Sequence, residues 1–411
     1  MKVAFAAILG FGTVGSGVWE ILHKKQAEIA HRADRPIQIK YVLVRRHPAQ
    51  YPGTPQPCFI QDIDTILNDP EITVVAECIG GTRAAYPYVK ACLARGKSVC
   101  TSNKELVAAY GSELLALAKK MGCAFLFEAS VGGGMPVITP LYQCLSSGRV
   151  SRVCGIVNGT TNFMLTRMEH DGMSFADALA LAQKLGYAET IDPGDDVDGV
   201  DACRKTAILA SLLAGRQIPV NEIPARGIRP LTRQDMANAR RLNCTVKLIA
   251  HAQVDDDGNA AAGVEPMLVD QNDLLSSVED VFNGLRAESD LAGESFFYGR
   301  GAGKLPTASA VVTDMMDAVR YGAAVHSRLF WTGPDPDRPV RTDPGPGAYY
   351  VRAEGVPFAP LAAALPQVSF TLLDDTAAFA ECITPAQLAA LAAVCTARGG
   401  RLACTLRRLE Q

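Results

Sequence analysis

Short apolar runs alternate with amphipathic segments along the first third of the chain. Five of these runs have the length and the apolar content of buried strands, at residues 3–9, 37–44, 73–79, 98–101 and 124–128. Between them, apolar residues recur with helical spacing at residues 14–26, 62–67, 86–95 and 105–121. Strands that alternate with helices of this length predict a doubly wound parallel sheet of the α/β class.

The pattern changes after residue 149. Strands are predicted at residues 150–157, 226–231, 245–253 and 263–269, with two more within residues 283–297. Helices are predicted at residues 137–146, 163–170, 175–185, 200–213 and 308–319, and residues 158–162 read as a polar turn. These elements predict a second domain built on a mixed sheet.

The C-terminal segment follows a stretch rich in proline, aspartate, glycine and arginine at residues 331–347, which is typical of a linker. Beyond it, strands are predicted at residues 348–353, 368–373, 377–383 and 401–407, and helices at residues 358–365 and 385–397. The resulting order, βαββαβ, is that of a ferredoxin-like unit.

A glycine motif lies where the first predicted strand meets the first helix. Gly10, Gly12 and Gly15, with Thr13 and Val14 between the last two, form G-x-G-x-x-G. Such glycines allow a tight turn and the close approach of a pyrophosphate to the helix N-terminus. The motif alone is a weak signal, and the alternative is a plain glycine turn. Strand, glycines and helix arrive in the order of a Rossmann dinucleotide site, which favours that interpretation.

Other residues are predicted to face the same cofactor. The second strand ends in Arg45 and Arg46, where an acidic residue would favour NAD, so this pair suits the 2′-phosphate of NADP. The alternative is two solvated arginines. Ligands of such sheets lie beyond the carboxyl ends of the strands. That rule adds four candidates, and a glycine loop before the helix at residue 308 adds a fifth: Gly80, Thr82, Ser102, Lys104 and Gly303.

An acidic stretch precedes Lys205. Six carboxylates lie in residues 189–201, and Pro193-Gly194 interrupts regular structure there. Asp201 and Lys205 are four residues apart in a predicted helix, so both side chains project from one face. This arrangement suits an ammonium-bearing substrate held beside a proton-transferring lysine. The alternatives are a solvated acidic loop or a calcium loop, although the EF-hand spacing is absent.

A glycine run at residues 129–136 follows Glu128. Its carbonyls and the Glu128 carboxylate suit a monovalent cation, and the run also suits a hinge between domains.

Composition narrows the function further. The chain has 411 residues and a formal net charge of -3, so it lacks the basic footprint of a nucleic-acid-binding protein. No apolar run reaches membrane-spanning length. The 12 cysteines are scattered, without a C-x-x-C pair or zinc spacing. We expect reduced thiols in the cytoplasm.

These motifs together resemble the homoserine dehydrogenase family, and the resemblance extends to about residue 319. It rests on the first glycine turn, on the segments at residues 102–104, 128–136 and 158–162, on the acidic stretch to Lys205, and on residues 301–309. The resemblance implies reversible oxidation of L-homoserine to L-aspartate 4-semialdehyde with NAD(P), in threonine and methionine biosynthesis. It also implies a homodimer or homotetramer.

The resemblance assigns roles to individual residues. Lys205 exchanges a proton with the substrate hydroxyl, and Lys104 positions the substrate and is a second candidate for proton transfer. The carboxylates implied to bind the substrate, with the first nearest its ammonium group, are Glu189, Asp195, Asp196 and Asp201. The positions implied to hold sodium, three of them through carbonyls, are Glu128, Val131, Gly133 and Met135. Gly133 stands where alanine is common.

The implied domains are a Rossmann domain at residues 1–130 and 305–330, a substrate-binding and dimerisation domain at 131–304, a linker at 331–347 and an ACT-like domain at 348–411. In the last of these the ligand loop of the family is reduced to residues 354–358, where Pro357 removes a backbone donor. We therefore expect an oligomerisation module with a weak or absent threonine response.

Two rival classes remain open at this point. A phosphorylating aspartate-semialdehyde dehydrogenase requires a nucleophilic cysteine with a histidine partner, and no such pair is evident. A non-catalytic nucleotide-binding sensor has no need of Lys205 and its acidic loop. For Lys205 as a base, burial and Lys104 lower the lysine pKa while Asp201 raises it, and the sequence does not decide between them.

Overall fold

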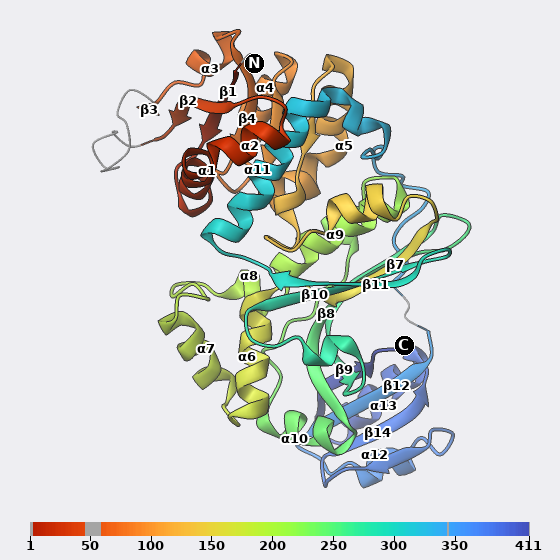
Figure 1. Cartoon of the computed structure of the whole chain (residues 1–411). Coiled ribbons are helices and arrows are strands. Elements are labelled where there is room, and N and C mark those ends of the chain that lie inside the picture. The colour runs from red at the N-terminus through yellow and green to blue at the C-terminus, as the bar shows by residue number, and fades with distance from the viewer. Residues whose placement is uncertain (1–2, 46–58, 343–344, 411) are drawn as a thin grey trace.

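The computed structural model describes residues 3–45, 59–342 and 345–410. In Figure 1 the N-terminal sheet lies at the top, a second sheet in the middle and the C-terminal segment at the bottom. No described helix combines the length and apolar character needed to cross a lipid bilayer.

The N-terminal sheet is parallel throughout and has the order β3-β2-β1-β4-β5-β6. Its strands are β1 (Ala4–Leu9), β2 (Ile37–Leu43), β3 (Phe59–Ile60), β4 (Ile72–Glu77), β5 (Ser98–Thr101) and β6 (Phe125–Leu126). This confirms the predicted doubly wound sheet. The strand order reverses between β1 and β4, and a crevice beyond their carboxyl ends is the place where such sheets bind ligands.

Helices connect these strands, and one helix returns from far along the chain. The local helices are α1 (Thr13–Lys24), α2 (Gln26–Arg32), α3 (Asp64–Asn68), α4 (Ala85–Ala94) and α5 (Lys104–Met121). The returning helix is α11 (Lys304–Tyr321), which runs among the N-terminal helices in Figure 1. It approaches α1 so closely that a Cβ atom on Gly17 would lie 2.8 Å from the Cβ of Ala308.

The middle part is an antiparallel sheet in the order β11-β10-β7-β8-β9. Its strands are β7 (Val150–Ile156), β8 (Cys244–Val254), β9 (Ala260–Asp270), β10 (Phe282–Ser289) and β11 (Gly293–Arg300). Its helices are α6 (Gly159–His170), α7 (Phe175–Lys184), α8 (Gly194–Val197), α9 (Val200–Ala214) and α10 (Arg233–Arg241). Helices α6, α9 and α10 pack against β8.

Two local predictions in this part are wrong, and one predicted helix is shorter than expected. Residues 226–231 form no strand: Gly227 approaches the Val197 carbonyl so closely that a Cβ would lie 2.1 Å from it. The helix expected at residues 137–146 covers only residues 138–144 and is a π-helix from Pro140 to Cys144. The turn expected at residues 158–162 is the first turn of α6, because the Asn158 side chain caps that helix.

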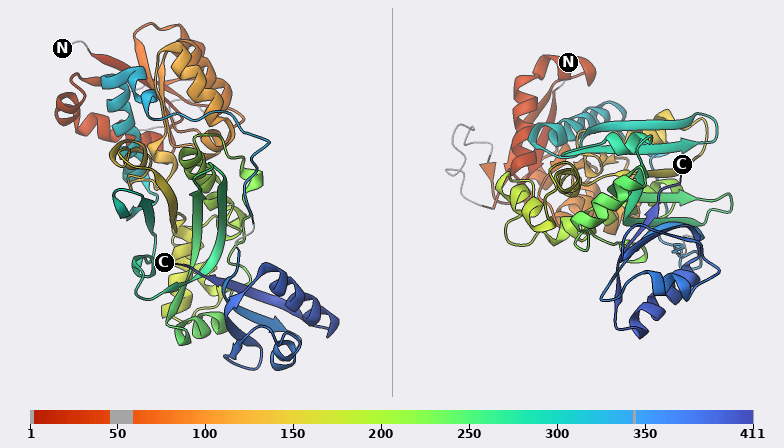
Figure 2. Two further views of the ribbon diagram at one scale, coloured as in Figure 1. Left: turned by 90° about the vertical axis from the view of Figure 1, so that its right-hand side faces the viewer. Right: turned by 90° about the horizontal axis from the view of Figure 1, so that it is seen from below.

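The C-terminal segment has the predicted order βαββαβ. It consists of β12 (Gly347–Glu354), α12 (Ala359–Ala363), β13 (Phe370–Leu372), β14 (Ala377–Ile383), α13 (Pro385–Ala397) and β15 (Arg401–Arg408). Its strands are antiparallel in the order β15-β12-β14-β13. Strand β15 also pairs in parallel with β9, so that the two sheets form one sheet of nine strands. The second view in Figure 2 shows the segment projecting below the middle sheet.

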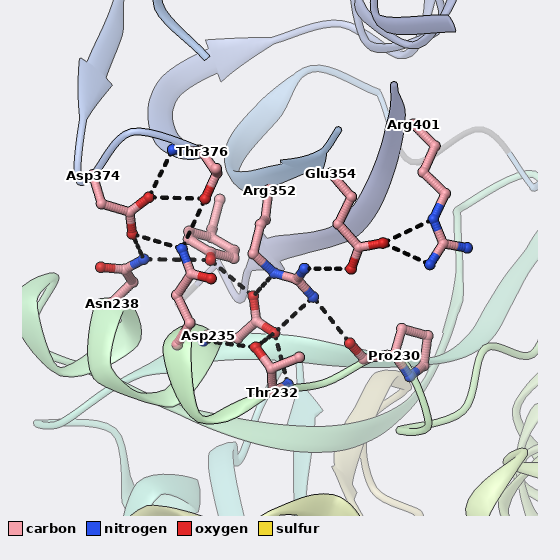
Figure 3. Close-up of polar contacts among 11 residues, drawn as sticks. Pro230, Thr232, Asp235, Asn238, Arg352, Glu354, Asp374, Thr376 and Arg401 are labelled. Carbon is pink, nitrogen blue, oxygen red and sulfur yellow. Dashed lines mark hydrogen bonds and ion pairs between the residues drawn. The ribbon is translucent and has the colours of Figure 1, made fainter. Parts of the chain in front are cut away.

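A buried polar network joins this segment to α10 (Figure 3). The Asp235 carboxylate, fully buried, accepts hydrogen bonds from Arg352 Nε at 2.8 Å and from the Tyr350 hydroxyl at 2.8 Å. Asn238 donates to Asp374 at 2.7 Å beside this pair. The segment is therefore fixed to the middle part by side chains as well as by strand pairing.

The start of the predicted linker is packed rather than loose. Trp331 is almost completely buried, and its indole N–H donates to the Gln217 side chain at 3.1 Å. The same ring lies against Gly111 of α5, where a Cβ atom would approach it to 2.6 Å. Gln217 also accepts from the backbone N–H of Ser112. This contact ties α5 of the N-terminal part to the end of α9.

Candidate active site

The glycine turn after β1 lies at the carboxyl edge of the parallel sheet. Gly10 has a φ of +91°, which favours glycine, and a Cβ on Gly15 would lie 2.1 Å from the Gly10 carbonyl oxygen. Helix α1 begins at Thr13 with Gly12 as its N-cap and has no acidic residue in its first turn. Its positive end is therefore open to a phosphate group, as the dinucleotide motif requires.

The neighbouring end of β4 is held in place by a buried carboxylate. Glu77, at the end of β4, accepts hydrogen bonds from the Ile79 N–H at 2.7 Å and from the Thr101 hydroxyl at 2.5 Å. Burial raises the pKa of Glu77, although these hydrogen bonds lower it. Gly80 and Thr82 follow β4 directly, so they lie at the carboxyl edge where they were predicted.

Asn103 connects the segment after β4 to the start of α5. Its side chain caps the helix by accepting from the Leu106 N–H at 3.1 Å, and its amide donates to the Gly81 carbonyl at 2.6 Å. Ser102 and Lys104 flank it and thereby take fixed places beside the crevice. Gly303, also predicted to face the cofactor, is the N-cap of α11 and has a φ of +127°.

The two arginines predicted to read the ribose phosphate are only partly described. Arg45 lies exposed just after β2, and its carbonyl accepts from the Gln61 side chain at 3.1 Å. Arg46 lies outside the described residues.

Asp201, at the end of the acidic stretch, forms ion pairs with two lysines. Asp201, on α9, pairs through Oδ1 with Lys104 Nζ at 2.7 Å and through Oδ2 with Lys205 Nζ at 2.8 Å. Lys205 also donates to the Val157 carbonyl at 2.7 Å. Lys104 is the first residue of α5, at the carboxyl edge of the parallel sheet, so the cluster lies beside the dinucleotide crevice.

The charges in this cluster stabilise one another. Burial alone would raise the pKa of Asp201, but the ammonium groups of Lys205 and Lys104 outweigh it, and the pKa falls below its ordinary value. For Lys104, burial lowers the pKa and the charge of Asp201 raises it, with a net rise. Lys104 is therefore a cation at neutral pH.

Asp196 lies next to this cluster, and Asn158 links the two. The Asn158 amide nitrogen donates to Asp196 Oδ1 at 2.7 Å and to Asp201 Oδ2 at 2.9 Å. Burial raises the pKa of Asp196, and the charge of Asp201 adds to the rise. The sequence pointed to Asn158 only as part of a polar turn and missed this role.

Two other predicted substrate ligands lie farther out. Asp195 is mostly exposed and pairs with Arg204 at 2.6 Å. Glu189 is exposed, and only its backbone carbonyl has a partner among the hydrogen bonds of the described residues, the Gln183 side chain at 2.9 Å. The structure thus brings Asp196, Asp201 and both lysines together but leaves Asp195 and Glu189 at the rim.

The Glu128 carboxylate caps a helix. Its oxygens accept hydrogen bonds from the backbone N–H groups of Val137 at 2.6 Å, Ile138 at 3.0 Å and Thr139 at 2.6 Å. Three of the roughly four acceptor sites of this carboxylate are thereby used, so it has little capacity left for a cation.

The loop that follows Glu128 turns back on itself. Gly132 and Gly133 have φ values of +76° and +58°, and a Cβ on Gly133 would lie 2.3 Å from the Gly301 carbonyl oxygen. Val131 and Met135 are buried on either side. Within the described residues there is no group of three or more histidine, cysteine, aspartate or glutamate side chains arranged to hold a metal. A cation here would depend on the loop carbonyls.

A Rossmann crevice beside a lysine–carboxylate cluster is typical of a nicotinamide-dependent oxidoreductase. Two family models match the chain: "Homoserine dehydrogenase, NAD binding domain" over residues 10–128 and "Homoserine dehydrogenase" over residues 136–316. The chain belongs to the homoserine dehydrogenase family, whose members are NAD(P)-dependent oxidoreductases acting on a hydroxyl group.

Individual relatives agree with this assignment. The chain is 39% identical to the homoserine dehydrogenase of Bacillus subtilis over 83% of its own length and 79% of the relative. A solved homoserine dehydrogenase from Thiobacillus denitrificans superposes with a TM-score of 0.88 at 32% identity, covering 100% of this chain and 99% of that one. A hyperthermophilic archaeal homoserine dehydrogenase in complex with NADPH has a TM-score of 0.66 at 27% identity, covering 77% of this chain and 98% of that one.

Proposed function

We propose that this chain interconverts L-homoserine and L-aspartate 4-semialdehyde with NAD(P), and that Lys205 exchanges the proton. The observation that carries the assignment of residues is the pairing of Lys104 and Lys205 with one buried carboxylate beside the dinucleotide crevice. Bound nicotinamide supplies or accepts the hydride. The protein must then supply orientation and a proton donor or acceptor.

The cluster divides these tasks. An ammonium group has three donors, and those of Lys205 to Asp201 and the Val157 carbonyl leave one for the substrate oxygen. During reduction, Lys205 donates its proton to the aldehyde oxygen as negative charge develops there. During oxidation, its neutral form takes the hydroxyl proton. Asp201 holds the amine in place.

The remaining charges bind the substrate. Lys104 keeps its proton and contributes a fixed positive charge that positions the substrate. Asp196 and Asp201 present carboxylates to the ammonium group, and Glu189 and Asp195 complete the set from the rim.

A cysteine-dependent reaction is disfavoured by the state of the nearby thiols. Burial raises the pKa of Cys203 and of Cys100, whereas a nucleophilic cysteine needs a lowered pKa. The test is NADPH consumption with aspartate semialdehyde in the absence of phosphate. Consumption supports the proposal. A reaction that instead requires NADP, phosphate and the semialdehyde would support a phosphorylating dehydrogenase, and no turnover would support a nucleotide-binding sensor.

Cofactor choice is proposed to lean to NADP through Arg45 and Arg46. Replacing an exposed arginine that contacts the 2′-phosphate should lower the NADP to NAD ratio of kcat/KM about tenfold, roughly the effect of one charged hydrogen bond. Arg45→Ala is the test, and Arg35→Ala, exposed at the opposite end of β2, is the matched control. An unchanged ratio in Arg45→Ala would show that this arginine does not read the phosphate.

A monovalent cation, sodium in the first instance, is proposed for the loop after Glu128. The carbonyls of Val131, Gly133 and Met135 are the oxygens available in a turn that positive φ values fold tightly. Unfolding temperature measured in sodium, potassium and choline chloride at equal ionic strength tests the site without requiring activity. Equal temperatures in all three salts would argue against it.

We further propose the four-part domain division expected from the sequence, a cytoplasmic location, and a homodimer or homotetramer formed through the middle sheet. Apolar side chains on the strands and loops of this part are exposed, with relative exposures of 54% for Leu274, 71% for Leu291 and 53% for Tyr298. These side chains are the candidates for burial in the proposed assembly. A stable, active monomer in analytical ultracentrifugation would contradict the assembly.

A further inference from the structure

We infer that Asn158 is a positioning residue: its amide clamps Asp196 and Asp201 into one ammonium-binding pair next to Lys205. The inference rests on the proposed function and names the residue that organises its substrate site. Asn158 is buried and donates to both carboxylates through the same nitrogen, at 2.7 Å and 2.9 Å. The two hydrogens of one amide group thus hold two acids side by side.

The orientation of this amide is fixed by its other end. Asn158 Oδ1 accepts from the backbone N–H of Thr161 at 2.8 Å and from the Thr161 hydroxyl at 2.8 Å. Ionised carboxylates only accept hydrogen bonds, so the nitrogen must face Asp196 and Asp201. A rotated amide would lose both contacts to the carboxylates and the contact to the Thr161 N–H.

The residue that precedes Asn158 contacts Lys205. Val157 and Asn158 follow β7, and the Val157 carbonyl accepts from Lys205 Nζ at 2.7 Å. Two consecutive residues therefore hold Lys205, Asp201 and Asp196 in one arrangement. A displacement of residue 158 would therefore move the carboxylates of Asp196 and Asp201 relative to Lys205, the proton donor.

The clamp also opposes the repulsion between the two acids. Burial and the charge of Asp201 raise the pKa of Asp196, whereas the hydrogen bond from Asn158 and the charge of Lys205 lower it. The other charged groups nearby are already paired: Lys104 of α5 with Asp201, and Arg204 of α9 with Asp195. Removing the amide should therefore raise the pKa of Asp196 further.

The consequence for activity has a definite sign. Asp196 binds an ammonium group only when ionised, and its ionised fraction falls as the pH falls through its pKa. A higher pKa moves the loss of binding to higher pH. The acid limb of kcat/KM for homoserine should therefore shift upward in variants that lack the amide donor.

Two variants separate the clamp from helix capping. Asn158 is the N-cap of α6, and serine and aspartate are also good N-caps. Asn158→Ser keeps the helix cap and removes the amide that donates to both carboxylates. Asn158→Asp keeps the cap and the shape and places a third carboxylate in the cluster.

Asn162→Ala is the matched control. It removes another buried asparagine of the same helix, whose amide donates to the Val278 and Phe282 carbonyls at 3.1 Å each. It does not touch the carboxylate pair in any contact that the structure describes.

The experiment measures kcat and KM for homoserine and NADP between about pH 5 and pH 9, the range in which such limbs are resolved. Asn158→Ser loses the hydrogen bonds to both carboxylates. It should therefore raise the homoserine KM at least about tenfold, the effect expected for a single lost hydrogen bond to a charged group. Its acid limb should shift upward, and Asn158→Asp should show larger changes in both. The NADP KM should stay unchanged, and Asn162→Ala should lower the unfolding temperature without moving the acid limb.

An unmoved acid limb and homoserine KM in Asn158→Ser, or an equal shift in Asn162→Ala, would overturn the inference. Failure of the wild-type chain to turn over homoserine would refute the proposed function separately. The clamp can then still be tested by carboxyl NMR titration of Asp196, which should ionise at higher pH in Asn158→Ser than in the wild type. Identical titration curves would overturn the clamp alone.

Discussion

Asp201 and Asp235 are both buried carboxylates that accept hydrogen bonds from cations and from a neutral side chain, in two different parts of the molecule. Asp201 binds Lys104, Lys205 and Asn158. Asp235 binds Arg352 and Tyr350. The chemistry of the two networks is similar, and the difference lies in the cation.

The arginine at Asp235 uses four of its five N–H donors. Arg352 donates through Nε and Nη2 to Asp235, through Nη1 to Glu354 and through Nη2 to the Pro230 carbonyl (Figure 3). A planar guanidinium with all its donor nitrogens engaged suits a permanent joint between two elements. The lysines at Asp201 are point charges with donors to spare, and the Lys104 side chain is 35% exposed. The lysines at Asp201 thus keep free N–H donors that a substrate can reach, whereas the guanidinium of Arg352 only joins two parts of the protein.

The strongest test of this contrast is Lys205→Ala. Loss of the proton-transfer group should lower kcat by about two to four powers of ten, the range of a missing general acid or base. The NADP dissociation constant should stay near that of the wild type, since the dinucleotide contacts are separate. Turnover within about threefold of wild type would remove Lys205 from the mechanism.

Arg352→Met tests the other network. It leaves the Asp235 carboxylate buried without its cation, which should cost about 3–5 kcal/mol of unfolding free energy. Activity of the folded variant should remain near that of the wild type. The matched control is Arg401→Met, since Arg401 pairs with Glu354 at 2.6 Å but is 75% exposed; it should cost at most about 0.5 kcal/mol. Equal losses in chemical denaturation would mean that burial does not distinguish the two pairs.

The sequence predicts one of these networks and not the other. Asp201 and Lys205 are local, four residues apart in a strongly periodic helix, and Lys104 follows a strand whose carboxyl end is a known ligand position. Asp235 and Arg352 lie 117 residues apart. Nothing in the sequence around either residue indicates burial, and their contact depends on the docking of the C-terminal segment against α10 and β9. Pairing between distant elements leaves no periodicity to detect.

The same reasoning explains the smaller errors. Segments with long, regular periodicity, such as α5 and α13, are predicted to within one residue of their true ends. Residues 226–231 carry a short strand-like pattern, but the close approach of Gly227 to the Val197 carbonyl decides their conformation. Asn158 is visible in the sequence only as a turn residue, because its partners come from α8 and α9.

Glu189→Gln sharpens the comparison at the rim of the substrate site. If the carboxylate meets the substrate ammonium, the variant should raise the homoserine KM about tenfold, as for a lost charged hydrogen bond, and leave the NADP KM unchanged. Asp192→Asn is the matched control, because Asp192 is exposed in the same loop and accepts from the Gly194 N–H at 2.9 Å. Equal effects on both substrates, or an equal effect of the control, would indicate a structural role.

The smallest expected effect is that of threonine. A site for a free amino acid in the C-terminal segment would use the turn between β12 and α12, where backbone groups and an acid can bind its ammonium and carboxylate. Here the Ala353 N–H donates to the Thr376 carbonyl at 2.9 Å and the Phe358 N–H to the Asp375 carbonyl at 2.7 Å. Glu354 is held by Arg352 and Arg401 at 2.9 Å and 2.6 Å. The acid of the turn and the backbone donors at its two ends are thus already engaged.

Threonine should therefore leave activity and unfolding temperature of the full chain unchanged. A truncated chain without the segment is a poor control, because removing β15 would expose the edge of β9 and the buried Asp235. Glu354→Gln in the full chain is the better one: it weakens the contacts of the turn without deleting a strand. Inhibition of the wild type that Glu354→Gln abolishes would show that the turn binds threonine. Inhibition that persists in the variant would place the threonine site elsewhere in the chain.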